Sequence, residues 1–213
     1  MVNNAGDATG EYSNEGYDTV EVHTGALTNG GYTRQANIER GALAEDVGVG
    51  GLLGNAESNK LDGNSASNTL QGGGGHDQLY GYGGDDTLIG NGDNESDLLY
   101  GGVGFDTYHA GNSDVVQDTD QRGTVNFAGT RLRGGIYSGK FGNADVFKDA
   151  FTSTTYYYDT TSKTLTDLRA GESLKLSNFR NMQDPRDFLA FNGMNLGIRL
   201  EGAPARSQQP AGG

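Results

Sequence analysis

The most regular feature of the sequence is an apolar residue that returns at a fixed place in six consecutive glycine-led units. Four units of nine residues begin at Gly54, Gly63, Gly72 and Gly81, an expanded unit with two extra residues begins at Gly90, and a last nine-residue unit begins at Gly101. The eighth position of each regular unit, and its equivalent in the expanded one, is Leu61, Leu70, Leu79, Leu88, Leu99 and Tyr108. The sixth position is Asn59, Asn68, Asp77, Asp86, Asp97 and Asp106.

This pattern predicts short strands that alternate with glycine-rich turns. Six residues make a turn whose glycines accept positive φ, and three residues make a strand with one inward apolar side chain. Two units then complete one coil of about 18 residues, so that turns two units apart stack on the same edge. The fold class is therefore all-β: a parallel β-roll, a right-handed β-solenoid of nonapeptide repeats, with β-rich N- and C-terminal capping segments.

Composition indicates that apolar burial alone does not stabilise this chain. Its 213 residues include 37 glycines, three prolines and no cysteine, and 33% are hydrophobic. The net charge is −13, which divalent cations would relieve and which makes nucleic acid and anionic membranes poor partners. No run approaches the roughly 18 apolar residues of a transmembrane segment.

The repeated turns offer the ligands that calcium prefers. Each gap between stacked turns is lined by backbone carbonyls and two acidic or amide side chains, an all-oxygen environment that suits a hard cation. An isolated glycine–aspartate turn is commonly just a hairpin turn, and a dry structural repeat is the alternative for the whole array. Six units in phase favour metal binding.

At these residues the chain resembles the repeats-in-toxin (RTX) family of haemolysin-type calcium-binding proteins, because the unit matches G-G-x-G-x-D-x-U-x. The match is specific from Gly72 to His109, whereas the two preceding units carry Asn in place of Asp. The resemblance implies several bound Ca²⁺ ions, folding on binding calcium outside the cell, and export from a bacterium by a type I secretion system. It also implies an extracellular location and a larger secreted parent protein.

The family's ligand pattern, carried onto this sequence, implies two main cages. The first would use the turn with Gly72, Gly74, Gly75 and Asp77, together with Asp97 and the loop that begins at Gly90. The second would use the turn with Gly81, Gly83, Gly84 and Asp86, together with Gly102, Gly104 and Asp106. Weaker cages would pair Asn59 with Asp77 and Asn68 with Asp86, since asparagine is neutral.

The flanks divide the chain into four expected segments. Residues 1–53 form irregular strand-rich coils that cap the roll, 54–120 form the nonapeptide roll, 121–200 form a β-rich capping region, and 201–213 form a disordered tail. Strands are expected in YDTVEV (17–22), GTVNFAG (123–129), TYYYD (155–159), KTLTDL (163–168) and NLGIRL (195–200). The segments 123–135 and 191–200 resemble the region that closes RTX modules.

Other functions find less support in the residues. No G-x-S-x-G motif, thiol or HExxH motif is present, so we predict no catalytic site in this chain and place any enzymatic activity of the parent protein outside it. Calcium-dependent polysaccharide binding, as in alginate epimerases, is the alternative function, and a cell-surface partner is a further prediction. His76 and His109 are interpreted as solvated, Tyr156–Tyr158 as a strand, and Asp184–Pro185 as an ordinary loop. No regular row of exposed threonines is evident, which argues against ice adhesion.

Overall fold

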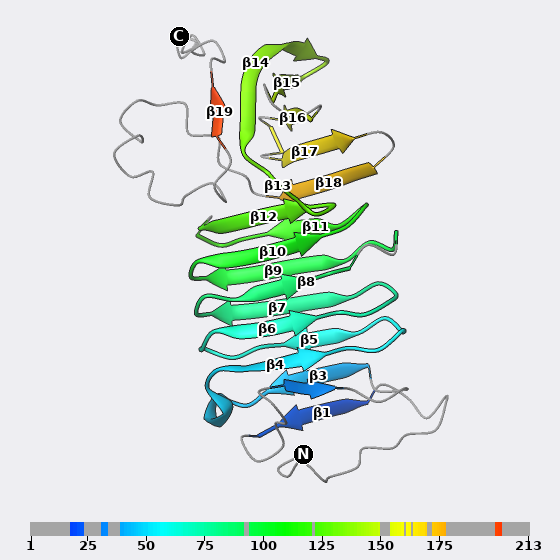
Figure 1. Cartoon of the computed structure of the whole chain (residues 1–213), viewed down its shortest axis with the longest axis vertical. Coiled ribbons are helices and arrows are strands. Elements are labelled where there is room, and N and C mark those ends of the chain that lie inside the picture. Colours follow the sequence, from blue (N-terminus) through cyan, green and yellow to red (C-terminus); the bar gives the residue numbers. More distant parts are fainter. Residues whose placement is uncertain are drawn as a thin grey trace, which may run out of the picture.

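The protein is built from two β-sheets that face each other across a narrow core (Figure 1). The computed structural model describes residues 18–23, 31–33, 39–91, 94–120, 122–149, 154–159, 161–162, 164–169, 172–177 and 199–201. Sheet A contains, in spatial order, β1 (Thr19–Val22), β3 (Arg40–Leu43), β5 (Lys60–Asp62), β7 (Gln78–Gly83), β9 (Leu98–Val103), β11 (Val115–Gln117), β18 (Glu172–Ser177), β17 (Thr164–Arg169), β16 (Thr155–Asp159), β15 (Ala144–Lys148), β14 (Gly134–Phe141) and β19 (Arg199–Glu201). Sheet B contains β13 (Thr130–Arg131), β12 (Gly123–Phe127), β10 (Asp106–Ala110), β8 (Thr87–Ile89), β6 (Asn68–Gln71), β4 (Gly50–Leu53) and β2 (Gly31–Thr33).

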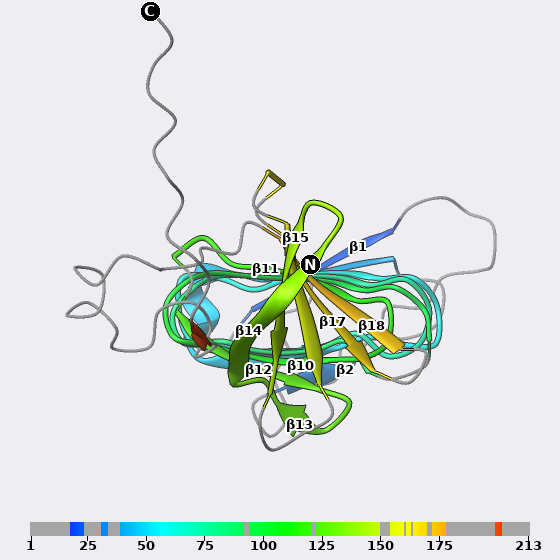
Figure 2. The same ribbon diagram turned by 90° about the horizontal axis from the view of Figure 1, so that it is seen from above.

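Successive strands of the repeat region alternate between the two sheets, so each pair of units makes one coil of a solenoid. Every strand pairs in parallel with the strand two units away, as β5 does with β7 and β7 with β9. Seen along the long axis, the coils superimpose as a flattened ring (Figure 2). The predicted parallel β-roll is therefore confirmed.

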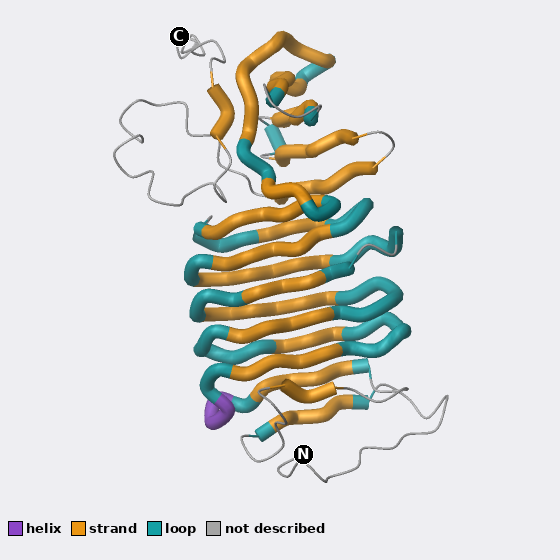
Figure 3. Tube along the Cα trace, viewed as in Figure 1, coloured by secondary structure: helices purple, strands orange, loops and turns teal. Residues whose placement is uncertain are grey.

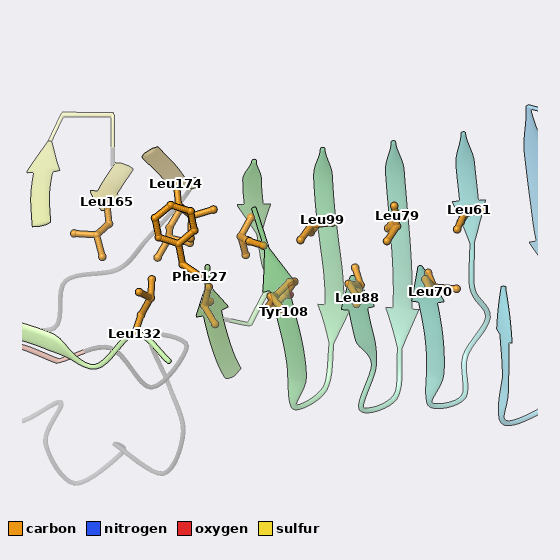
Figure 4. Packing of buried hydrophobic residues seen from close by; sticks show 14 of the residues in the cluster. Leu61, Leu70, Leu79, Leu88, Leu99, Tyr108, Phe127, Leu132, Leu165 and Leu174 are labelled. Atoms are coloured by element: carbon orange, nitrogen blue, oxygen red, sulfur yellow. The ribbon is translucent and has the colours of Figure 1, made fainter. Parts of the chain in front are cut away.

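The core of the roll is the predicted row of apolar side chains. Leu61, Leu79 and Leu99 are in register along sheet A, and Leu70, Leu88 and Tyr108 are in register along sheet B. All six side chains are fully buried (Figure 4). Because each coil presents two such side chains to its neighbours, burial of the row links every coil to the next.

Parallel pairing continues beyond the nonapeptide units at both ends. Strands β1 and β3 extend sheet A, and β2 and β4 extend sheet B, while β12 adds a strand after the last unit. A short 3-10 helix, Glu45–Val47, lies in the loop between β3 and β4. Among the described residues, no helix is long and apolar enough to cross a membrane.

The C-terminal strands continue sheet A as an antiparallel meander (Figures 1 and 3). The connection is the parallel pair β11–β18, and β18, β17, β16, β15 and β14 then follow antiparallel to one another. Their buried side chains, including Phe147 and Leu174, belong to the same core cluster as the leucines of the roll. Asp184–Pro185 and the predicted disordered tail beyond Glu201 lie outside the described residues.

The outer face of sheet B carries a threonine row that the sequence interpretation missed. Thr69, Thr87, Thr107 and Thr124 lie in register on β6, β8, β10 and β12. The row is hidden in the sequence because threonine recurs only in alternate units. The neighbouring outward column holds Gln71, Ile89, His109 and Asn126, so the face does not repeat in two dimensions, and we interpret the threonines as cross-strand pairs that stabilise the sheet.

Candidate metal centres at the two edges of the roll

The loops that enter sheet A form the first edge of the roll, on the right in Figure 3, and carry a ladder of stacked carboxylates. The backbone N–H of Asn59 donates to Oδ1 of Asp77 at 2.8 Å, and the N–H of Asp77 donates to Oδ1 of Asp97 at 2.8 Å. The N–H of Asp97 in turn donates to Oδ1 of Asp114 at 2.9 Å. Each acidic side chain thus joins its own coil to the one before it. We call this set of residues edge 1.

The loops that leave sheet A form the second edge, on the left in Figure 3, which repeats the arrangement. The N–H of Asn68 donates to Oδ1 of Asp86 at 2.7 Å, and the N–H of Asp86 donates to Oδ1 of Asp106 at 2.9 Å. We call these residues edge 2. Stacking of turns two units apart, which the nine-residue phase predicted, therefore brings Asp77 together with Asp97 and Asp86 together with Asp106.

The carboxylates of edge 2 are held in a setting that penalises their negative charge. Asp86 and Asp106 are buried, and the second oxygen of Asp86, Oδ2, accepts no hydrogen bond from any described residue. Burial, followed by the nearby charge of Asp106, raises the pKa of Asp86 to about 7. Burial also raises the pKa of Asp106 to about 6, and the charge of Asp120 adds to this. A buried carboxylate oxygen without a donor is what a cation ligand requires.

The first glycine of each unit keeps open the space in front of the carboxylate. A Cβ atom on Gly81 would overlap Oδ2 of Asp86 and lie 2.6 Å from the carbonyl oxygen of Gly101. On edge 1, a Cβ atom on Gly72 would overlap Oδ2 of Asp77. The gap at Gly81 therefore joins a carboxylate oxygen to a carbonyl of the next coil, in a space that a side chain would fill.

The structure places the glycines of the expected ligand set in the loops of the two edges or in the strands that lead into them. Gly72, Gly74 and Gly75 lie in a loop of edge 1, and Gly84 and Gly104 lie in the turns of edge 2. Gly81 and Gly83 lie in β7, and Gly102 lies in β9, the strands that run toward edge 2. Two carbonyls lie in a different gap from the one the sequence pattern implied. The carbonyl oxygen of Gly72 lies beside Gly54 and Asn59, and that of Gly81 lies beside Gly63 and Asn68. The carbonyl near Asp86 belongs to Gly101, a residue outside the expected set.

The ligand set expected from the sequence left out the residues at the ends of the ladders. Asp114 completes edge 1, and its Oδ2 accepts the N–H of Gly111 at 2.6 Å. Asp114 was not assigned as a ligand because it follows Asp97 by 17 residues and so falls out of the nonapeptide phase. At edge 2 the hydroxyl of Tyr108 donates to Oδ2 of Asp118 at 2.6 Å, and burial raises the pKa of Tyr108 far above its usual range. Asp120 Oδ2, in the same loop, accepts the N–H of Gly104 at 3.2 Å.

The donor set fits calcium better than it fits a transition metal. Within the described residues, no three His, Asp or Glu side chains converge as a metal cluster, so cations in these gaps would be held by carboxylates together with backbone carbonyls. Oxygen ligands of this kind are those of Ca²⁺, which accepts flexible coordination, whereas Mg²⁺ demands a near-ideal octahedron. The residues present therefore fit the expected ion.

Comparison with known proteins identifies the repeats. Residues 62–94 match the family model of the RTX calcium-binding nonapeptide repeat in four copies. No curated protein and no solved structure is significantly similar to the chain.

Proposed function

The repeat region is an RTX β-roll, a structural calcium-binding fold that binds Ca²⁺ at several sites, and from this premise we propose that the gaps at edge 1 and edge 2 hold the ions and that their binding drives folding. The observation that carries the proposal is the buried Oδ2 atom of Asp86, which faces glycine-lined space and accepts no hydrogen bond from any described residue. On edge 1, the stacked carboxylates of Asp77, Asp97 and Asp114 would also serve as ligands.

The distribution of charge supports metal-driven folding. Residues 1–121 contain 20 acidic and three basic residues, a net charge of −17, whereas residues 122–213 contain eight acidic and 12 basic residues, a net charge of +4. Stacking the coils concentrates the negative charge, which opposes folding until cations neutralise it. Binding free energy then becomes folding free energy, because the unfolded chain has no preformed cage.

The same physics suggests where the protein works. The chain would stay unfolded where calcium is scarce and fold where calcium is abundant, which suits passage through a type I secretion system followed by folding outside the bacterium. RTX repeats are typical of extracellular bacterial proteins, and we propose that this module supports a larger secreted protein of that kind. The β-roll itself is not a catalytic fold, so we place any enzymatic activity of the parent protein outside the roll.

Far-UV circular dichroism tests the proposal directly. The chelator-treated chain is titrated with CaCl₂ and, in parallel, with MgCl₂. A cooperative gain of β signal with calcium alone is expected. A spectrum that is already folded and does not respond to calcium would contradict metal-driven folding.

Two variants test whether the calcium response comes from the gaps at the edges. Asp86→Ala should raise the calcium concentration at the midpoint, because Asp86 borders the gaps toward both Asn68 and Asp106. Asp85→Asn is the control, since Asp85 is exposed in the same turn and the carboxamide keeps the hydrogen bond that Oδ1 of Asp85 accepts from the N–H of Phe105 at 2.7 Å. Equal midpoints for the two variants would show that the ligand assignment is wrong.

Polysaccharide binding is a second candidate function. The net charge of −13 disfavours an anionic polysaccharide, although Arg122, Arg131 and Arg133 are all exposed near the end of sheet B. The observation that favours a neutral polysaccharide is a cavity beside edge 1, which the next subsection describes.

A further inference from the structure

A cavity of about 330 Å³ lies where edge 1 meets the C-terminal meander. Its walls come from four separate segments: the end of β8 with the following loop, the end of β10 with the following loop, the β12–β13 turn, and the start of β18. The volume is about ten times the 30 Å³ share of a water molecule and falls within the usual range for small-ligand sites.

Polar groups of complementary kinds reach this cavity. Asn126, His109 and Glu172 all line it, and within the described part of the chain none of their side chains makes a hydrogen bond or ion pair. A carboxamide and an imidazole each donate and accept, and a carboxylate accepts. A ligand with several hydroxyls, each both a donor and an acceptor, would satisfy this set.

Hydrogen bonds connect three of the segments that line the cavity. The side chain of Asn112 accepts a hydrogen bond from the N–H of Ser173 at 2.9 Å and donates to Oδ1 of Asn94 at 3.3 Å. The preceding residue, Gly111, donates its N–H to Asp114. The cavity is therefore fixed to the last rung of edge 1, and its ligand would bind only the folded roll.

The charge of the lining selects among hydroxylated ligands. Among the described residues that line the cavity there is one carboxylate, Glu172, and no lysine or arginine. A sulfated or uronic sugar would meet repulsion there without a counter-charge. Ile89 and Ala110 add apolar surface suited to the CH face of a sugar ring. We infer that the cavity binds one neutral sugar unit of a glycan, a role beyond calcium-dependent folding.

The residue type in the turn between β12 and β13 supports a ligand site, because a small side chain there leaves the cavity open. Ala128 and Gly129 form a two-residue hairpin loop with φ of 46° and 73°. Such turns favour asparagine, aspartate or glycine at the first position, because a positive φ strains an alanine. Ala128 lines the cavity, where an asparagine side chain would enter the space that the alanine leaves free.

Isothermal titration calorimetry on the calcium-loaded full chain tests the inference. The methyl glycosides of glucose, galactose and mannose are the probes, and glucuronate is the charged comparison. We expect saturable binding of at least one neutral glycoside, weaker binding of glucuronate, and a loss of about tenfold in affinity for Asn126→Ala, the usual effect of one lost hydrogen bond. Gln71→Ala, in the same outward column on β6, is the control and should bind as the unaltered chain does.

Ala128→Asn separates binding from folding. We expect it to keep or raise the Tm, since asparagine suits the turn, and to lower the affinity at least tenfold. The inference is overturned if the folded chain binds none of the three glycosides, if glucuronate binds as well as they do, or if neither Asn126→Ala nor Ala128→Asn changes the affinity. A calcium-dependent gain of β signal without sugar binding would overturn this inference alone and leave the proposed function standing.

Discussion

Replacing Asp86 by asparagine removes one buried negative charge and keeps the shape of the side chain. The new carboxamide oxygen still accepts the N–H of Asn68, as Oδ1 of Asp86 does at 2.7 Å. Asn59 and Asn68 show that asparagine fits this position of the unit, because their side-chain oxygens accept backbone N–H groups at 2.8 Å. The effect of Asp86→Asn is therefore electrostatic.

The size of the effect follows from the pKa of Asp86, which burial raises from 3.8 to about 7. At about 1.4 kcal/mol per pKa unit, three units would amount to about 4 kcal/mol in a site closed to water. Screening by solvent at the loop edge reduces this to about 2 kcal/mol. Because folding raises this pKa, Asp86 costs the folded state nothing below about pH 4, where it is protonated in both states. The folded state loses about 2 kcal/mol of stability as the pH rises through about 7 and the buried carboxyl ionises.

Without calcium at pH 8, Asp86→Asn should therefore be about 2 kcal/mol more stable than the unaltered chain, roughly a 30-fold change in the ratio of folded to unfolded protein. The difference should vanish near pH 4. With calcium the order should reverse, because the variant has lost a charged ligand.

Urea unfolding at pH 4 and pH 8, followed by circular dichroism in chelator and in excess calcium, measures all three values. Where the chelated chain is unfolded, the concentration of trimethylamine N-oxide needed to fold it replaces the urea midpoint. Asp85→Asn serves as the control for an exposed charge in the same turn. A variant that is less stable than the unaltered chain in chelator at pH 8, or that shows the same difference at both pH values, would refute the reasoning.

Three further predictions concern the packing around the gaps. Leu88→Ala should lower the free energy of unfolding in calcium by about 3 kcal/mol, because the side chain is fully buried between two coils, and thermal unfolding measures this. Gly81→Ala should abolish most of the calcium response seen by circular dichroism, since its Cβ would overlap Oδ2 of Asp86. A normal titration would show that the gap in front of Asp86 does not hold calcium. Tyr108→Phe should cost about 1–3 kcal/mol in urea unfolding, because Asp118 would lose its buried 2.6 Å hydrogen bond.

The roll was predictable because its signal is local and repeated. The apolar eighth position fixes which side chain points inward, and the nine-residue spacing fixes which turns stack. Leu79 and Leu99, for example, are in register although 20 residues separate them, because the two extra residues of the expanded unit fall in a loop and not in a strand.

The features that the sequence did not predict depend on contacts between segments outside the repeat pattern. The sequence did not show that the C-terminal strands continue sheet A, because the pairing of Val116 with Leu176 joins residues 60 positions apart. It did not assign Gly101 to the gap of Asp86, since the direction of a carbonyl depends on the turn and not on the residue type. The cavity at Asn126 was also hidden, because its walls come from four separate segments.

The expanded unit has a consequence for how such a chain can change in evolution. The N–H of Asp77 reaches the carboxylate of Asp97 across 20 residues at 2.8 Å, the same distance at which Asn59 reaches Asp77 across 18. A coil with two extra residues therefore keeps the same ladder hydrogen bond as a regular coil. Insertions at the edges should be tolerated where insertions in the three-residue strands are not, because a one-residue slip would turn the inward leucine of that strand outward. The 90–97 loop is accordingly the natural place for this protein to acquire, or for an engineer to graft, a new surface segment.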